Sequence, residues 1–147
     1  MKDIGQRCQQ KIFLAQQHNM KKDIKNIDDI KLMVNSFYGK IRDNALLGPI
    51  FEDKIQNRWQ AHLEKMYRFW QTILLNEHSY NGAPFNPHAS MPIDKTHFEV
   101  WIEIFKNTVD ELFEGPVSDE AKNKGTLMAT IFNSKIEYLK NNANKGL

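Results

Sequence analysis

The chain has 147 residues, 41% of them hydrophobic, which suffices for the core of one domain rather than two. Its 20 Lys and Arg residues against 18 Asp and Glu residues leave a formal net charge of +2, a balance that gives no reason to expect a nucleic-acid or membrane-surface partner. The single cysteine, Cys8, excludes an internal disulfide framework, a cysteine-rich zinc site and an Fe–S cluster held within one chain.

Apolar residues recur at helical spacing along the whole chain, and no segment shows the alternation of a strand. The sequence therefore predicts an all-α protein of about five main helices. Near the N-terminus, Ile4, Cys8 and Ile12 are spaced as one face of a first helix. We place this helix in an N-terminal extension, residues 1–27, and expect residues 28–147 to form the main domain.

The second and third helices have the longest apolar stripes of the first half of the chain. The second begins near Asp28 or Asp29, either of which is able to cap it. It ends before Pro49, because proline disfavours helix at the residue before it. The third runs from about Asn57 to Asn76. The stripes are Ile30, Met33, Val34, Phe37 and Ile41 in the second helix, and Trp59, Leu63, Met66, Phe69, Trp70, Ile73 and Leu74 in the third.

The least helical part of the chain, residues 80–94, contains three prolines and separates the third helix from the fourth. Thr96 and Glu99 are spaced as a capping box for the fourth helix. Ser118 is placed to cap the last one. The apolar stripes of these two helices are Phe98, Trp101, Ile102, Phe105, Val109, Leu112 and Phe113, then Ala121, Met128, Ile131, Phe132, Ile136 and Leu139.

The sequence shows no targeting or membrane segment. The N-terminus lacks a continuous apolar stretch of signal-peptide length, and no apolar run approaches the ~20 residues that a membrane-spanning helix needs. We therefore expect a cytoplasmic protein without a membrane partner.

The five histidines match no zinc-protease pattern, and no pair of Glu-x-x-His motifs indicates a di-iron bundle. Two of them stand out by position. His62 lies on the apolar stripe of the third helix, where it is either an ordinary core or rim side chain or a polar group that faces a cavity. His88 follows Asn86-Pro87, a segment suited to start a short helical turn. It is either an exposed loop residue or a metal ligand on a restrained backbone.

Two aromatic residues with a polar hydrogen, Tyr38 and Trp101, lie on or beside apolar helix faces. Each is either ordinary aromatic core or a hydrogen-bond donor to a ligand in a cavity, since a buried hydroxyl or indole N–H needs a partner. The spacing alone leaves both alternatives open.

Four stretches of the sequence, in this order and at these separations, together resemble one family, the group III truncated haemoglobins of bacteria. The stretches are SFYGKIRDNALLGPIF (Ser36–Phe51), WQAHLEKMYRFW (Trp59–Trp70), YNGAPFNPH (Tyr80–His88) and HFEVWIEIF (His97–Phe105). The resemblance covers roughly Asp28 to Tyr138. It implies a truncated globin domain over residues 28–147, with two helix pairs forming a 2-on-2 sandwich around haem. The extra helix predicted in the N-terminal extension lies beyond the compact core of that family.

The resemblance also assigns site residues. It places the metal ligand, the proximal histidine, at His88. It places the distal, ligand-binding residues at Tyr38, His62 and Trp101. Contacts to the cofactor fall on Phe51, Met66, Phe69, Trp70 and Phe98. We expect His97, beside Phe98, to be solvated.

The family implies one haem b per chain and binding of O2, and of NO and CO, at a histidine-ligated iron. Two distal donors favour ligand retention, sensing or redox detoxification over bulk oxygen delivery. NO dioxygenase or peroxidase-like activity would require a reductase, which the sequence does not identify. The alternative is a haem-free helical interaction or regulatory bundle. In that case the tryptophans are core residues and His88 is a loop residue.

Overall fold

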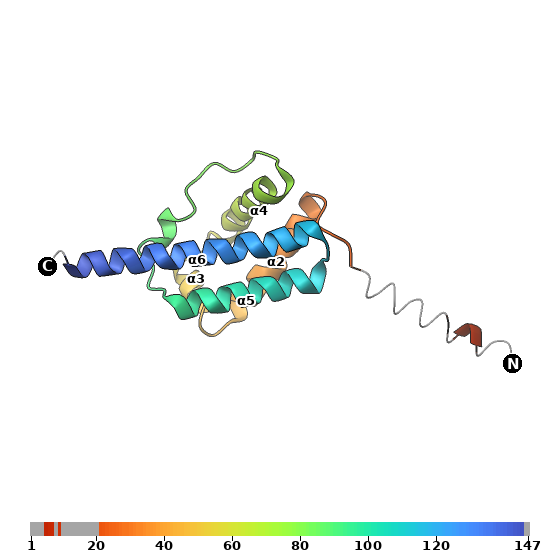
Figure 1. The fold of residues 1–147 in the computed structure, drawn as a ribbon, viewed down its shortest axis with the longest axis horizontal. Helices are drawn as coiled ribbons and strands as arrows, with labels where there is room; N and C mark the ends of the chain where they lie inside the picture. The colour runs from red at the N-terminus through yellow and green to blue at the C-terminus, as the bar shows by residue number, and fades with distance from the viewer. Residues whose placement is uncertain (1–4, 8, 10–20, 146–147) are drawn as a thin grey trace.

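The computed structural model describes residues 5–7, 9 and 21–145, and within these ranges it is helical without strands (Figure 1). The all-α class predicted from the periodicity is confirmed. The elements are α2 (Ile27–Asp43), α3 (Gly48–Ile55), α4 (Trp59–Leu75), the 3-10 turn η1 (Asn86–His88), α5 (Lys95–Leu112) and α6 (Pro116–Lys145). The residues that predicted the first helix, Ile4, Cys8 and Ile12, lie outside the described residues.

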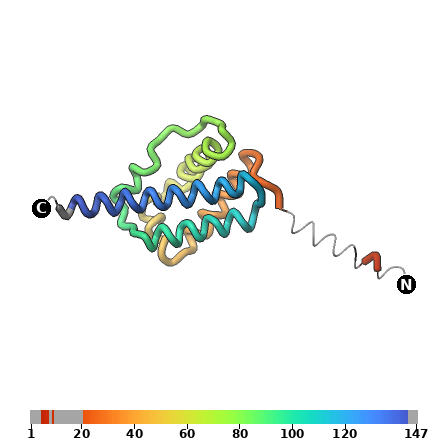
Figure 2. Tube along the Cα trace, viewed as in Figure 1, coloured from red at the N-terminus to blue at the C-terminus, as the bar shows by residue number. Residues whose placement is uncertain are grey.

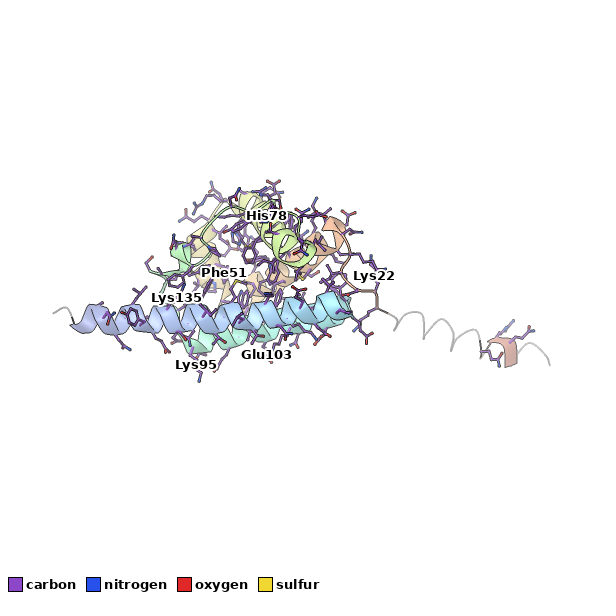
Figure 3. The ribbon with its side chains drawn as sticks, turned by 45° about the horizontal axis from the view of Figure 1, so that its top comes forward. Lys22, Phe51, His78, Lys95, Glu103 and Lys135 are labelled. Carbon is purple, nitrogen blue, oxygen red and sulfur yellow. The ribbon has the colours of Figure 1, made fainter. Side chains whose placement is uncertain are left out.

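The helices form two packed pairs. Helix α2 packs against α4, and α5 runs beside the long α6; α2 also contacts α5 and so joins the pairs. Figure 2 shows α6 beside α5 along much of its length, with its C-terminal end extending beyond the other helices. In Figure 3, Lys95 and Glu103 lie on the outer side of α5, whereas Phe51 lies among the side chains between α6 and the elements opposite.

The core forms where the predicted apolar stripes meet. Phe37 of α2 packs edge-to-face on Phe105 of α5, with the ring centroids 5.3 Å apart. Trp70 of α4 stacks on the same Phe105 ring at 5.0 Å. Ile24, which precedes α2, is also buried here. The residues 21–26 therefore pack on the helices, and the domain boundary after residue 27 stays a prediction.

Helix α2 is capped by a residue that the sequence analysis did not choose. The side chain of Asn26 accepts a hydrogen bond from the backbone N–H of Asp29 at 3.0 Å. Asp28 and Asp29 lie in the first turn instead, where their charges favour the positive end of the helix dipole.

Helix α3 was not predicted, because Gly48-Pro49 was interpreted only as the end of the preceding helix. Proline is well suited to the first turn of a new helix, since its missing N–H needs no partner there. Gly48 is required by packing: a Cβ at this position would lie 2.6 Å from the carbonyl oxygen of Arg42. This close approach places the start of α3 against the end of α2.

The last two helices also begin differently from the prediction. Asp94, not Thr96, caps α5, and its partner in the capping box is His97 rather than Glu99. Helix α6 begins at Pro116, and the side chain of Asp23 accepts hydrogen bonds from its first turn. Ser118, predicted as the cap, donates its hydroxyl to Asp23 at 2.7 Å.

None of the helices in the described part of the chain is long and apolar enough to cross a membrane.

Candidate functional site: a cavity between the helix pairs

A cavity of about 390 Å³ lies between the two helix pairs and is lined mainly by apolar side chains. Its size is typical of pockets for small molecules and cofactors, which are mostly apolar with a few placed polar groups. All nine site residues predicted from the sequence line this one cavity. They are Tyr38, Phe51, His62, Met66, Phe69, Trp70, His88, Phe98 and Trp101.

His88 lies at the end of η1, and the backbone fixes the orientation of its ring. Its Nδ1 is 2.6 Å from the carbonyl oxygen of Pro84. Because a carbonyl oxygen only accepts, Nδ1 carries the proton and donates it, which leaves Nε2 as a free lone pair. The ring also packs on Phe132, with the centroids 5.0 Å apart.

Two effects keep this imidazole neutral. Burial lowers the pKa of His88, and the nearby charge of Lys54 lowers it further, against the opposing hydrogen bond to Pro84. A neutral imidazole with one nitrogen committed to a backbone carbonyl is the form in which histidine ligates metals.

His62, on α4, presents a polar atom without a partner. Its Nε2 is buried and forms no hydrogen bond to any residue that the structure describes. Burial, followed by the charge of Lys65, lowers its pKa to about 4, so the ring is neutral at pH 7. An unsatisfied buried donor or acceptor costs free energy, typically ~1–3 kcal/mol, unless a ligand or water satisfies it.

Tyr38, on α2, lies against His62 with ring centroids 5.0 Å apart, in an edge-to-face arrangement. It is 7% exposed, and burial raises the pKa of its hydroxyl well above the ordinary value of 10, so the hydroxyl keeps its proton. Among the described residues none hydrogen-bonds to this hydroxyl. Tyr38 is therefore a neutral donor that faces the cavity without a protein partner.

Trp101, on α5, is held by aromatic contacts. Its ring stacks on Phe105 at 5.6 Å with an interplanar angle of 7° and meets the edge of Phe37 at 5.4 Å. Its indole N–H forms no hydrogen bond within the ranges that the structure covers. Three polar groups without protein partners, from Tyr38, His62 and Trp101, thus line one cavity.

The sequence analysis missed the cations of the lining, Lys54, Arg58 and Lys65. Arg58 donates to the carbonyl oxygens of Ile55 and Lys54 and so closes the end of α3. The spacing of 54, 58 and 65 was not a usable signal, because Lys54 lies on a helix that was not predicted, Arg58 just before α4 and Lys65 on α4. Their convergence favours a ligand with anionic groups.

The expectation that His97 is solvated was wrong. Its side chain is 17% exposed, and it lines the cavity. The capping box holds it there, because its Nδ1 lies 3.1 Å from the backbone nitrogen of Asp94, which donates to it. The signal in the sequence was the three-residue separation of Asp94 and His97, which the Thr96–Glu99 hypothesis obscured.

No protein-family model matches the chain. In sequence it is 28% identical over 121 residues to the group 3 truncated hemoglobin Ctb of Campylobacter jejuni, an alignment that covers 80% of this chain and 95% of that protein. In structure it is similar to the crystal structure of the group III truncated hemoglobin from the same organism, with a TM-score of 0.73 over 80% of this chain and 95% of that one. The globin-like fold is thereby confirmed. Over most of its length the chain is therefore similar, in sequence and in fold, to a group III truncated haemoglobin, as the four sequence stretches predicted.

Proposed function

We propose that this chain is a haem protein that binds diatomic gases at an iron held by His88. One observation carries the proposal: an oriented, neutral imidazole and three polar groups without protein partners line the same apolar cavity. A protein leaves buried polar groups unpaired where a ligand is to meet them. The similarity to a truncated hemoglobin supports haem as the cofactor.

The lining fits haem b, one per chain, on chemical grounds. The apolar contacts would come from Phe51, Met66, Phe69, Trp70 and Phe98. The cations Lys54, Arg58 and Lys65 suit the two carboxylates of the porphyrin, since Lys and Arg pair well with carboxylates. When bound, haem would supply an iron atom that His88 would hold and that would bind a small ligand.

The polar residues of the cavity would select and retain that ligand. The Tyr38 hydroxyl and the Trp101 indole N–H would donate hydrogen bonds to it, and neutral His62 would add a third polar contact. Each donor contributes about 0.5–1.5 kcal/mol. Two donors together would slow ligand release by about 5- to 140-fold, because 1.4 kcal/mol is a factor of ten.

Slow release favours retention, sensing or redox detoxification over bulk oxygen delivery. O2, NO and CO are the small ligands that we expect to bind beside these donors. A turnover reaction would require electrons from a separate reductase.

The visible spectrum of the full chain tests the proposal. After haem is added, the ferrous protein is expected to show a Soret band that shifts on addition of CO, and His88→Ala is expected to lose the iron–imidazole signature. His78→Ala is the matched control, because His78 is exposed and outside the lining (Figure 3). A colourless protein would reject the proposal and favour a haem-free bundle. A His88→Ala spectrum identical to the parent's would reject His88 as the residue that holds the iron.

A further inference from the structure

The outer face of α6 carries a line of exposed apolar side chains. Four of the six large hydrophobic residues that are exposed in the described part of the chain belong to this helix. Three of them, Leu127, Ile131 and Tyr138, are 54%, 40% and 66% exposed. With Ser134 between the last two, they follow one another in steps of four, three and four residues, the spacing by which one helix packs against another. We term these three apolar residues the α6 stripe.

The α6 stripe faces away from the other helices. Gly125 marks the opposite side of α6, because a Cβ there would lie 2.9 Å from the ring of Phe105 on α5. Ile136 lies on the same side as Gly125 and is 1% exposed. At 3.6 residues per turn, Leu127 is rotated about 160° around the helix from Gly125. No helix in the described part of the chain therefore covers the α6 stripe.

The N-terminal extension has an apolar stripe of its own. Ile4, Cys8 and Ile12, which lie outside the described residues, follow one another in steps of four, the spacing that predicts a first helix. Residues 5–7 between them are described, and they are helical and exposed. A single short helix is only marginally stable in water, so most helices in proteins depend on packing of their apolar face. The predicted helix therefore needs a surface to pack on.

The extension joins the fold beside the start of α6. The backbone oxygen of Lys22 accepts a hydrogen bond from the N–H of Glu114 at 3.0 Å, and Asp23 caps the first turn of α6. Residues 1–16 as a helix would be about 24 Å long, at 1.5 Å per residue. The α6 stripe extends over about 16 Å along its helix by the same measure. The extension is thus long enough to cover the stripe, with residues 17–20 left to make the turn.

One register aligns the two stripes. An extension that starts beside the first turn of α6 and follows this helix toward its C-terminal end runs antiparallel to it. If Cys8 is placed opposite Ile131 in that arrangement, Ile12 lies opposite Leu127. Both stripes then share one contact, as the apolar faces of paired helices do.

We propose that residues 1–16 form a helix that folds back on the outer face of α6 and covers the α6 stripe. Figure 1 draws residues 5–7 apart from α6, an arrangement that leaves this stripe in water. Docking removes its apolar surface from water, which is the driving force of the contact. The inference does not involve haem, so its test is independent of the proposed function.

A disulfide to the single natural cysteine tests the contact in the full chain. Ile131→Cys places a second thiol on the α6 stripe, and Glu103→Cys places one on the outer side of α5 as the matched control (Figure 3). Diamide oxidises the two thiols to a disulfide and takes up their two hydrogens. We expect the disulfide to Cys8 within one chain to form on the order of tenfold faster in Ile131→Cys, because a merely tethered segment meets both positions at similar effective concentrations.

Non-reducing electrophoresis and mass spectrometry distinguish the outcomes. Equal rates of disulfide formation in the two variants overturn the proposal. A disulfide that joins two chains, and that forms more slowly on dilution, also overturns it, because the extension then covers α6 of a second copy.

Amide hydrogen exchange of residues 1–16 in the full chain is a second readout that needs no added cysteine. We expect Ile131→Asp to speed this exchange several-fold, because a carboxylate in the α6 stripe removes the apolar contact. Leu32→Asp is the matched control, since Leu32 is 48% exposed and lies on α2. Unchanged exchange of α5 in both variants shows that the fold persists. If Ile131→Asp leaves the exchange of residues 1–16 unchanged, or if Leu32→Asp speeds it equally, the proposal is overturned.

Discussion

The side chain of Asp23 caps a helix that begins far from it in the sequence, and Asp23→Ala is expected to destabilise the whole fold. Its carboxylate accepts from the backbone N–H groups of Val117 and Ser118, both at 2.9 Å and 94 and 95 residues away. It also accepts from the Ser118 hydroxyl at 2.7 Å and from the N–H of Ile24 at 2.9 Å. The substitution removes all these acceptors at once.

The magnitude follows from the burial of the donors. Loss of an ordinary N-cap side chain costs about 0.5–2 kcal/mol. Ser118 is only 1% exposed, so water replaces the lost acceptor poorly, and an unsatisfied buried donor costs about 1–3 kcal/mol. We expect Asp23→Ala to lower the free energy of unfolding by about 2–4 kcal/mol, and Asp23→Asn, which keeps one oxygen acceptor, by about 1–2 kcal/mol.

Urea unfolding of the full chain, followed by far-ultraviolet circular dichroism, measures both variants. Asp28→Ala is the control, because Asp28 is exposed and contributes only a first-turn charge, typically about 0.3–1 kcal/mol. If Asp23→Ala lowers the free energy of unfolding no more than Asp28→Ala does, the cap from Asp23 does not stabilise the start of α6.

The stabilisation of the fold by the Asp23 carboxylate depends on pH, and the direction follows from the pKa of this group. Burial by itself raises the pKa of Asp23, but the hydrogen bonds from Ser118, Val117 and Ile24 outweigh it and lower the pKa below the ordinary 3.8. The unfolded chain therefore takes up the proton first as the pH falls. The stabilisation is fully present well above pH 3.8 and is lost as the pH falls through the folded pKa. The difference between parent and Asp23→Asn should shrink over that window.

Three other predictions concern the cavity and the helix corner. Tyr38→Phe and Trp101→Phe should each speed O2 dissociation by about two- to tenfold in stopped-flow measurements, since each removes one donor; unchanged rates in both variants would eliminate the two-donor hypothesis. Lys65→Gln should raise the pKa of His62 from about 4, because it removes the charge that, after burial, lowers this pKa most; an NMR titration that shows no rise would contradict this assignment. Gly115→Ala should destabilise the chain by about 1–3 kcal/mol, because φ is +142° there and a Cβ would lie 2.5 Å from the Asp23 carboxyl carbon; a melting temperature equal to the parent's would refute it.

The sequence predicted those parts of the fold that depend on the spacing of apolar residues within one helix. The apolar stripes of α2, α4, α5 and α6 are readable because helical period and burial coincide along one face. The caps were predicted poorly. Asn26 and Asp94 lie only two residues from the chosen Asp28 and Thr96, and several neighbouring polar side chains are equally able to cap.

The site residues could be predicted only because four stretches of the sequence resemble a known family. His88, Tyr38 and Trp101 each had two interpretations from spacing alone, and the four matched stretches brought them together. Their roles stay predictions. The cavity lining beyond them, including His97 and Lys54, was not predictable, because a residue's distance from a cavity depends on how its helix is rotated against its neighbours.

The amino-acid order by itself determined that the chain is all-α. It also determined which residues share one face of a helix, since side chains three and four apart lie on the same face whatever the rest of the molecule does. The tertiary structure alone decided which face meets which. It brought Asp23 to the start of α6 and placed the polar groups of Tyr38, His62 and Trp101 around one cavity. These contacts join residues distant in sequence, so no local pattern specifies them.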